Sequence, residues 1–229
     1  MLFNKSILAI VPARKGSSRI VGKNMQMLKG KSLIAWAGDC LKELDWIDLK
    51  VLSTDSDGYG EEGAKHGLTL CLRPDDLATD DSLIEDTLCF TLYACEAITQ
   101  KEYDVILLIE PTSPTRKPQD VEEATHMLIR NSGLPDSVVT VNLIDDKYKG
   151  HRTLHINSWD GRLGLNSGGP FAYPHYYKNG ICYAMTRECV LGRQIFTTNT
   201  LPLIIDRPIA NIDTDLDLKL AELLVGGKL

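Results

Sequence analysis

The sequence lacks several features that would place it in other protein classes. No apolar run approaches the ~18 residues that a membrane-spanning helix needs. The first residues lack the long apolar core and the small-residue cleavage site of a secretory signal. The six cysteines form no Cys-x-x-Cys pair and no regular spacing, so we expect buried free thiols and not a disulfide framework or a zinc site. These absences predict a cytoplasmic protein with no membrane partner.

An overall excess of positive charge is also absent. The formal net charge is −6, with 25 Lys and Arg against 31 Asp and Glu. This balance disfavours a nucleic-acid partner, because such domains usually carry a broad basic surface. Six basic residues nevertheless fall close together near the N-terminus: Arg14, Lys15, Arg19, Lys23, Lys29 and Lys31. The positive charge is local, and a local anion is therefore the expected ligand.

Strand-like and helix-like segments alternate along the chain. The expected strands are 7–13, 49–55, 68–74, 104–111, 137–144, 180–186 and 201–206, and the expected helices are 32–44, 61–66, 81–99, 118–130 and one from about 214. This alternation predicts a three-layer α/β fold, a mainly parallel sheet with helices on both faces. We expect one domain, 1–229, in which residues 145–180 form a hairpin arm or a dimer contact, because their pattern is weakly periodic. In such folds the ligand lies beyond the carboxyl ends of the strands.

The loop after the first expected strand carries much of the local charge. Glycine permits close approach of backbone N–H groups to an anion, and serine, lysine and arginine add donors, so a triphosphate is a natural ligand. A solvated basic loop explains the same spacing equally well. The nearby Gly30-Lys31-Ser32 does not end a P-loop, because position 25 is Met25 where that motif needs glycine. No G-x-G-x-x-G follows the first strand, which disfavours a dinucleotide cofactor.

Six motifs, in order, resemble those of one enzyme family. They are PARKGSSRIVGKN (12–24), LSTDS (52–56), LRPDDLATD (72–80), EPTSPTR (110–116), NGICY (179–183) and NIDTDLDL (211–218). Together they resemble the CMP-sialic acid synthetases, cytidylyltransferases that activate acidic keto-sugars and have a nucleotidyltransferase-like Rossmannoid fold. In such relatives the anomeric hydroxyl of the sugar attacks the α-phosphate of CTP, and pyrophosphate leaves.

The resemblance implies roles for individual residues. Lys23 and Arg14 would be catalytic, because phosphoryl-type transfer depends on positioning and on neutralising charge. The residues implied in nucleotide binding are Ala13, Arg14, Ser17, Lys23, Asn24, Arg73, Glu110, Thr112 and Ser113. Simpler explanations remain for some of them: Arg73 could pair with Asp75 or Asp76 at a strand end, and Thr112 and Ser113 could serve turn geometry between prolines.

The chain departs from the family pattern at Glu110, where relatives usually carry glutamine. An amide can both donate to and accept from the edge of cytosine. An ionised carboxylate only accepts, for instance from the N4 amine, and Glu110 must otherwise be protonated. Cytosine preference and another nucleotide therefore both remain open at this point.

The second departure concerns the metal. Relatives hold Mg²⁺ with an Asp-x-Asp pair, and the matching residues here are Asn211 and Asp213. Alternate residues of an extended segment share a side, so both could face one ion, although asparagine offers a neutral oxygen. Without the resemblance, an acidic first helical turn over 214–217 would explain the same residues.

The third departure concerns the sugar. Relatives carry an arginine shortly before the Asn-Gly pair that helps to recognise the sugar carboxylate, and the segment 168–180 has none. Asn179 and Tyr183 match sugar-pocket positions. The arginine could be replaced by Lys149, Arg152, His175 or Lys178. Asn179-Gly180 is equally a turn signal, and Tyr183 could belong to a strand core.

The leading hypothesis is a Mg²⁺-dependent homodimeric enzyme that couples CTP to an acidic 2-keto-3-deoxy sugar of the sialic acid type and releases pyrophosphate. One alternative keeps the fold but changes the sugar, to a Kdo-, legionaminic- or pseudaminic-type acid, or changes the nucleotide. Another is a catalytically weak nucleotide-binding protein, suggested by Asn211 and the missing arginine.

Overall fold

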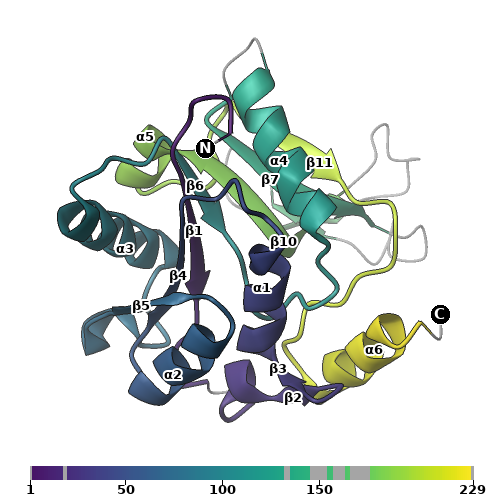
Figure 1. Cartoon of the computed structure of the whole chain (residues 1–229). Coiled ribbons are helices and arrows are strands. Elements are labelled where there is room, and N and C mark those ends of the chain that lie inside the picture. Colours follow the sequence, from purple (N-terminus) through teal and green to yellow (C-terminus); the bar gives the residue numbers. More distant parts are fainter. Residues whose placement is uncertain are drawn as a thin grey trace.

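A seven-stranded sheet runs through the molecule in the order β11-β7-β10-β6-β1-β4-β5 (Figure 1). The computed structural model describes residues 2–17, 20–131, 135–144, 154–156, 163–165 and 176–227. The strands of this sheet are β1 (Ile7–Pro12), β4 (Leu49–Thr54), β5 (Thr69–Leu72), β6 (Val105–Leu108), β7 (Ser137–Leu143), β10 (Tyr176–Thr186) and β11 (Thr200–Ile204). Parallel pairs join β1 to β4 and β6, β4 to β5, and β7 to β11. Strand β10 runs antiparallel to β6 and β7, so the predicted, mainly parallel sheet is confirmed.

Helices cover both faces of the sheet (Figure 1). Along β1, Ile7, Ala9 and Val11 belong to one apolar cluster, and Leu8 and Ile10 belong to the other. This alternation is what a strand buried on both faces produces. One face carries α1 (Leu33–Lys42), α2 (Asp57–Lys65) and α4 (Pro118–Arg130), and the other carries α3 (Ile84–Thr99) and α5 (Arg187–Leu191). The predicted three-layer arrangement is therefore confirmed.

The C-terminal helix α6 (Asp215–Val225) lies apart from these layers. It packs on a small cluster that includes Ile20, Leu28 and Ile212, beside the hairpin β2 (Met27–Leu28) and β3 (Lys31–Ser32). Two short 3₁₀ helices, η1 (Lys23–Met25) and η2 (Asp75–Leu77), interrupt the loops after β1 and β5. The hairpin packs against α6 and so holds the C-terminal part of the chain near the loop that follows β1.

Several elements differ from the sequence-based expectation. Helix α2 begins at Asp57, earlier than the expected start at 61. Its glycines are poor helix formers in isolation, which made the expected helix too short, but they allow the helix to pack closely on its neighbours. A Cβ at Gly60 would lie 2.8 Å from Leu70, and one at Gly63 would lie 2.8 Å from Leu52. The hairpin β2–β3 and the five-residue α5 are too short for periodicity to reveal. Strand β10 begins at Tyr176 and shifts register between Lys178 and Tyr183.

The expected arm is described only in part. Strands β8 (Leu154–Ile156) and β9 (Leu163–Leu165) pair antiparallel with one another in a sheet of their own. Residues 145–153, 157–162 and 166–175 lie outside the described residues, and Lys149 and Arg152 are among them.

All six cysteines are free, five are buried and Cys71 is partly buried, as the sequence predicts. In the ranges given above, no helix combines the length and the apolar character needed to cross a bilayer.

Candidate functional site

A cleft of about 340 Å³ opens where β1, β5 and β6 reach their carboxyl ends. The chain leaves β1 towards β4 on one side, and β6 lies on the other, so the strand order reverses beside β1. Ligands of open α/β sheets bind at such a reversal. The lining residues are Pro12, Arg14, Lys23, Asn24, Arg73, Leu77, Thr79, Asp80, Ser82, Ile84, Thr87, Glu110, Pro111, Thr112, Asn211 and Asp213. The cleft therefore lies where the sequence predicts it.

The loop after β1 is held to its neighbours by backbone contacts. The N–H of Lys15 donates to Asp55 Oδ1 at 2.8 Å, and Asn24 Nδ2 donates to the carbonyl of Arg14 at 3.1 Å. The guanidinium of Arg14 forms an ion pair with Asp80 across the mouth of the cleft. These contacts direct a basic loop into the cleft, which favours the anion-binding interpretation over a fully solvated loop.

Lys23 lies at the other end of this loop and reaches the C-terminal part of the chain. Its Nζ lies 3.0 Å from Asp213 Oδ1, and its side chain is only 18% exposed. Asp213 stands just before α6, whose capping box uses Thr214 and Asp217. The acidic helical turn and the cleft carboxylate are thus both present, on different residues. Ile212 is buried between Asn211 and Asp213, and those two residues both line the cleft.

Arg73 forms part of the cleft floor and is 5% exposed. Its Nη1 donates to Thr87 Oγ1 at 3.3 Å, and not to Asp75 or Asp76 as the simpler explanation required. Its buried Nε has no hydrogen-bond partner. Burial lowers the pKa of Arg73, an effect that nearby Asp55 opposes and Arg14 reinforces. A buried guanidinium with an unused donor is arranged to receive an acceptor from a ligand.

Glu110 follows β6 and lies among different charges from those around Arg73. Burial raises the pKa of its carboxyl, although Arg116, Lys178 and Lys23 oppose that rise. Asp55 and Arg14 are among the charges that act on Arg73, whereas Lys23 and Asp213 are among those that act on Glu110. The carboxyl therefore belongs to the end of the cleft that holds Lys23 and Asp213.

The same end offers oxygen atoms to a cation. Asn211 Oδ1 is buried and has no hydrogen-bond partner, and Asp213 supplies a carboxylate beside it. No group of three His, Cys, Asp or Glu side chains that could hold an ion occurs among the residues of the described ranges. Mg²⁺ commonly takes one or two carboxylates and completes its shell with water and substrate phosphates. One carboxylate and one amide oxygen fit this coordination preference.

Two further predicted residues face the interior. Ser113 is fully buried and donates from Oγ to the carbonyl of Asn179 at 3.2 Å. Asn179 Oδ1 accepts from Thr140 Oγ1 and from the N–H of Ile181, and its Nδ2 donates to Asn142 Oδ1 at 2.8 Å. These contacts hold the register shift in β10. A direct contact between Asn179 and a sugar stays a prediction.

Tyr183 and the two small loop residues also lie away from the lining. Tyr183 is 3% exposed inside the apolar cluster below α3, and burial raises the pKa of its hydroxyl. This environment is that of a strand core. Ala13 is fully buried, with its N–H bonded to the carbonyl of Ser53 at 2.9 Å. Ser17 is half-buried.

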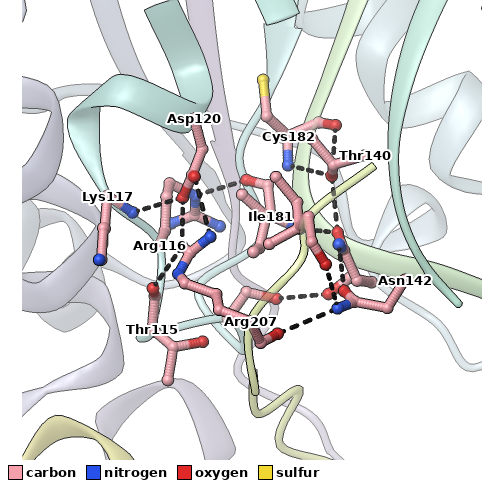
Figure 2. Close-up of polar contacts among 12 residues, drawn as sticks. Thr115, Arg116, Lys117, Asp120, Thr140, Asn142, Ile181, Cys182 and Arg207 are labelled. Atoms are coloured by element: carbon pink, nitrogen blue, oxygen red, sulfur yellow. Dashed lines mark hydrogen bonds and ion pairs between the residues drawn. The ribbon is translucent and has the colours of Figure 1, made fainter. Parts of the chain in front are cut away.

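Sequence reasoning missed the polar network that supports the cleft from below. Arg116 is buried and donates to the carbonyls of Glu110, Gly180 and Ile181. Figure 2 shows Arg207 between Asp120 and Asn142. Both terminal nitrogens of Arg207 donate hydrogen bonds to the Asp120 carboxylate, and Asn142 Nδ2 donates to the backbone carbonyl of Arg207. Arg116 ends the motif EPTSPTR, and a charged residue within a motif was the available signal. Arg207 carried no such signal.

The second omission is the stretch from Ser82 into the first turn of α3. Ser82, Ile84 and Thr87 line the cleft together with Leu77, Thr79 and Asp80 of the motif LRPDDLATD. The rule that ligands lie beyond strand ends indicates the beginning of this segment, but it does not identify the individual side chains.

Comparison with known proteins gives consistent results. Residues 8–150 match the family model described as cytidylyltransferase. The chain is 30% identical to the CMP-N,N'-diacetyllegionaminic acid synthase of Legionella pneumophila, over 96% of each protein. It is 27% identical to the N-acylneuraminate cytidylyltransferase of Escherichia coli, over 94% of this chain but only 51% of that protein.

Among solved structures, a CMP:2-keto-3-deoxy-manno-octonic acid synthetase complexed with CTP has the same fold. The TM-score is 0.71, and the match covers 98% of this chain and all of the other. The sequences are 16% identical, so this likeness concerns the fold alone.

Proposed function

The chain belongs to the cytidylyltransferase family, and we propose that it transfers CMP from CTP to an acidic 2-keto-3-deoxy sugar. In this reaction an oxygen of the sugar attacks the α-phosphorus of CTP. The new O–P bond forms as the bond to the β-phosphate bridging oxygen breaks, pyrophosphate leaves with the electron pair, and the hydroxyl proton is released. The observation that carries the proposal is the convergence of Arg14, Lys23 and Asp213 in one cleft at the carboxyl ends of the strands.

Each cleft residue has a role in this proposal. Lys23 and Arg14 bind the phosphates and stabilise the charge that develops on the leaving pyrophosphate. Arg73 offers its unused Nε to the nucleotide from the cleft floor. Ser113 and Asn179 act indirectly, by fixing the backbone that carries Thr112 and Gly180.

The cofactor is proposed to be Mg²⁺. Asp213 and the orphaned Oδ1 of Asn211 would hold it, and the ion would neutralise phosphate charge when bound. The main chain supports this pair, because the N–H of Ile212 donates to the carbonyl of Thr112 at 2.8 Å and so holds the segment against the loop after β6.

The sugar is proposed to be a nine-carbon acid of the sialic or legionaminic type. The match over 96% of the Legionella relative supports testing N,N'-diacetyllegionaminic acid first. Eight-carbon Kdo is the alternative of the same chemistry. We also propose a homodimer in the cytoplasm, and the six free thiols are consistent with a reducing compartment. Light scattering of the purified protein tests the dimer.

The activity is tested by following pyrophosphate release. The protein is incubated with Mg²⁺, each of the four nucleoside triphosphates in turn, and a panel of sialic, legionaminic, pseudaminic and Kdo-type acids. We expect release only when CTP and one class of acid are both present. Saturable CTP binding without product from any acid would contradict the proposed transfer and favour a nucleotide-binding protein.

A further inference from the structure

Two positions where this chain departs from its relatives lie together in the structure. Glu110 follows β6, whereas Asn211 precedes α6, and both line the cleft. A Cβ built at Gly180 would lie 2.4 Å from Glu110 Oε2 and 3.0 Å from Asn211 Nδ2. Both side chains therefore lie against Gly180, where a Cβ would leave them no room. Residue 180 also has a φ of +72°, which favours glycine.

The chemistry of the pair is complementary. Glu110 Oε2, Ser113 Oγ and Asn211 Nδ2 all lie beside Gly180, and Asn211 Oδ1 is buried without a hydrogen-bond partner. If residue 211 were an aspartate, two carboxylates would face one another at this point, and like charges at such separation disfavour one another. If residue 110 were a glutamine, Asp213 would be the one carboxylate of this end of the cleft.

Building on the proposed function, we propose that Glu110 and Asn211 have exchanged roles, so that Glu110 supplies the second anionic ligand of the divalent cation and Asn211 supplies a neutral oxygen. The positive charges that face Glu110 are Lys23, Lys178 and Arg116, and the negative charge that faces it is Asp213. Two carboxylates and a carbonyl oxygen then meet the metal together with the phosphates, which is a normal set for Mg²⁺. Cytosine recognition by Glu110, the role that sequence reasoning considered, competes with this proposal.

The proposal makes the two positions interdependent, and a double-mutant cycle measures that interdependence. The four proteins are the wild type, Glu110→Gln, Asn211→Asp and the double variant. Binding of Mn²⁺ is measured by the electron paramagnetic resonance signal of the free ion, first with protein alone and then with CTP, against a blank of CTP without protein. No sugar is added, so the readout does not depend on turnover.

We expect Glu110→Gln to weaken Mn²⁺ binding by about tenfold or more, because one of two anionic ligands is lost. Adding Asn211→Asp to that variant should restore most of the affinity, since the carboxylate returns to the other member of the pair. In the wild-type background, Asn211→Asp should gain much less. Glu61→Gln is the matched control, because it removes a carboxylate from the exposed face of α2 and should leave binding unchanged.

Three results would overturn the proposal. They are equal Mn²⁺ affinity of the wild type and Glu110→Gln, an effect of Asn211→Asp that is the same in both backgrounds, and absence of Mn²⁺ binding by every variant. A change in preference for CTP over UTP in Glu110→Gln, with Mn²⁺ affinity retained, would assign the carboxylate to the base instead.

Two further measurements keep the outcome interpretable. Melting curves of the four proteins identify any variant that fails to fold, and Glu110→Ala, which also removes the carboxylate, replaces Glu110→Gln if that variant is unstable. Failure of the transferase proposal has a different signature, which is absence of pyrophosphate release from the wild type with every acid.

Discussion

Two cavities of similar size lie at opposite edges of the same sheet, and they differ in how their polar groups are used. The cleft at the carboxyl ends of β1 and β6 has a volume of about 340 Å³, and the cavity at the other edge, beside the start of β6 and the end of β10, has about 410 Å³. In the second cavity Lys5 pairs with Asp104 at 2.9 Å, and Arg187 pairs with Glu96 through two hydrogen bonds.

The cleft also contains ion pairs, but it retains unused polar atoms. In the part of the chain that the structure describes, three buried side-chain nitrogen or oxygen atoms lack a hydrogen-bond partner. Two of them, Arg73 Nε and Asn211 Oδ1, belong to residues that line the cleft. Unpaired buried groups cost free energy, so they are expected where a ligand completes them. Volume alone does not distinguish the two cavities, whereas unsatisfied polar groups do.

The largest difference between the two edges should appear on removing Lys23. We expect Lys23→Ala to reduce kcat by about 10²–10³-fold, because one preorganised charge partner of the leaving group is lost. Steady-state pyrophosphate release measures the effect. Lys5→Ala, at the other cavity, is the matched control and should keep wild-type turnover. Normal kcat in Lys23→Ala would remove that residue from the mechanism.

Replacing Arg73 tests whether a buried group with an unused donor lowers the stability of the protein while it strengthens CTP binding. We expect Arg73→Met to weaken CTP binding by about tenfold to a hundredfold, since a charged donor is lost from the cleft floor. Its melting temperature should stay the same or rise, because a buried cation with an unused donor is removed. Calorimetric titration with CTP and thermal melting give the two values.

The control for Arg73 is Arg130→Met, an arginine on the exposed surface of α4. It should change neither CTP affinity nor melting temperature by much. A clear fall in melting temperature of Arg73→Met with unchanged CTP affinity would instead make Arg73 a structural residue.

The opposite edge should behave in the reverse way. Glu96 is 11% exposed and receives hydrogen bonds from Arg187 and from the N–H of Tyr103. We expect Glu96→Gln to destabilise the protein by about 1 kcal/mol, which lowers the melting temperature of a chain this size by about 2–4 °C. Turnover should not change. A loss of turnover without a loss of stability would mean that the second cavity contributes to function.

The smallest expected effect is the pH dependence of that pair. The hydrogen bond from Arg187 holds the pKa of Glu96 below its ordinary value, against an opposing effect of burial. A depressed folded-state pKa gives stability that is present above the unfolded pKa and is lost as pH falls through the folded pKa. The gap in melting temperature between wild type and Glu96→Gln should therefore shrink from about pH 6 to about pH 3. A constant gap would contradict the ion-pair explanation.

Much of this arrangement could be predicted from the chain alone. The alternation of Ile7, Ala9 and Val11 with Leu8 and Ile10 gives a strand buried on both faces, and the topology then places Arg14, Arg73, Glu110 and Asp213 at one edge. Strand ends and motif order carry this information, because the carboxyl ends of parallel strands meet at the same place.

The rest depends on side-chain direction and long-range contacts. Ser113 and Asn179 stand within the motifs EPTSPTR and NGICY, but their side chains turn inward and support the backbone. The convergence of Glu110 and Asn211 has no local signal either, because it requires the register shift in β10 and the glycine at its centre. Sequence spacing predicts neither.

The contact between Lys23 and Asp213 joins residues 190 positions apart. During synthesis the first strand, its loop and α1 leave the ribosome long before the segment that carries Asp213. Intermediates of translation can therefore fold the sheet around β1 and β4 while the catalytic assembly is still incomplete. A prematurely terminated product that stops before residue 211 would contain every strand of the main sheet but lack the part of the cleft lining that Asn211 and Asp213 supply.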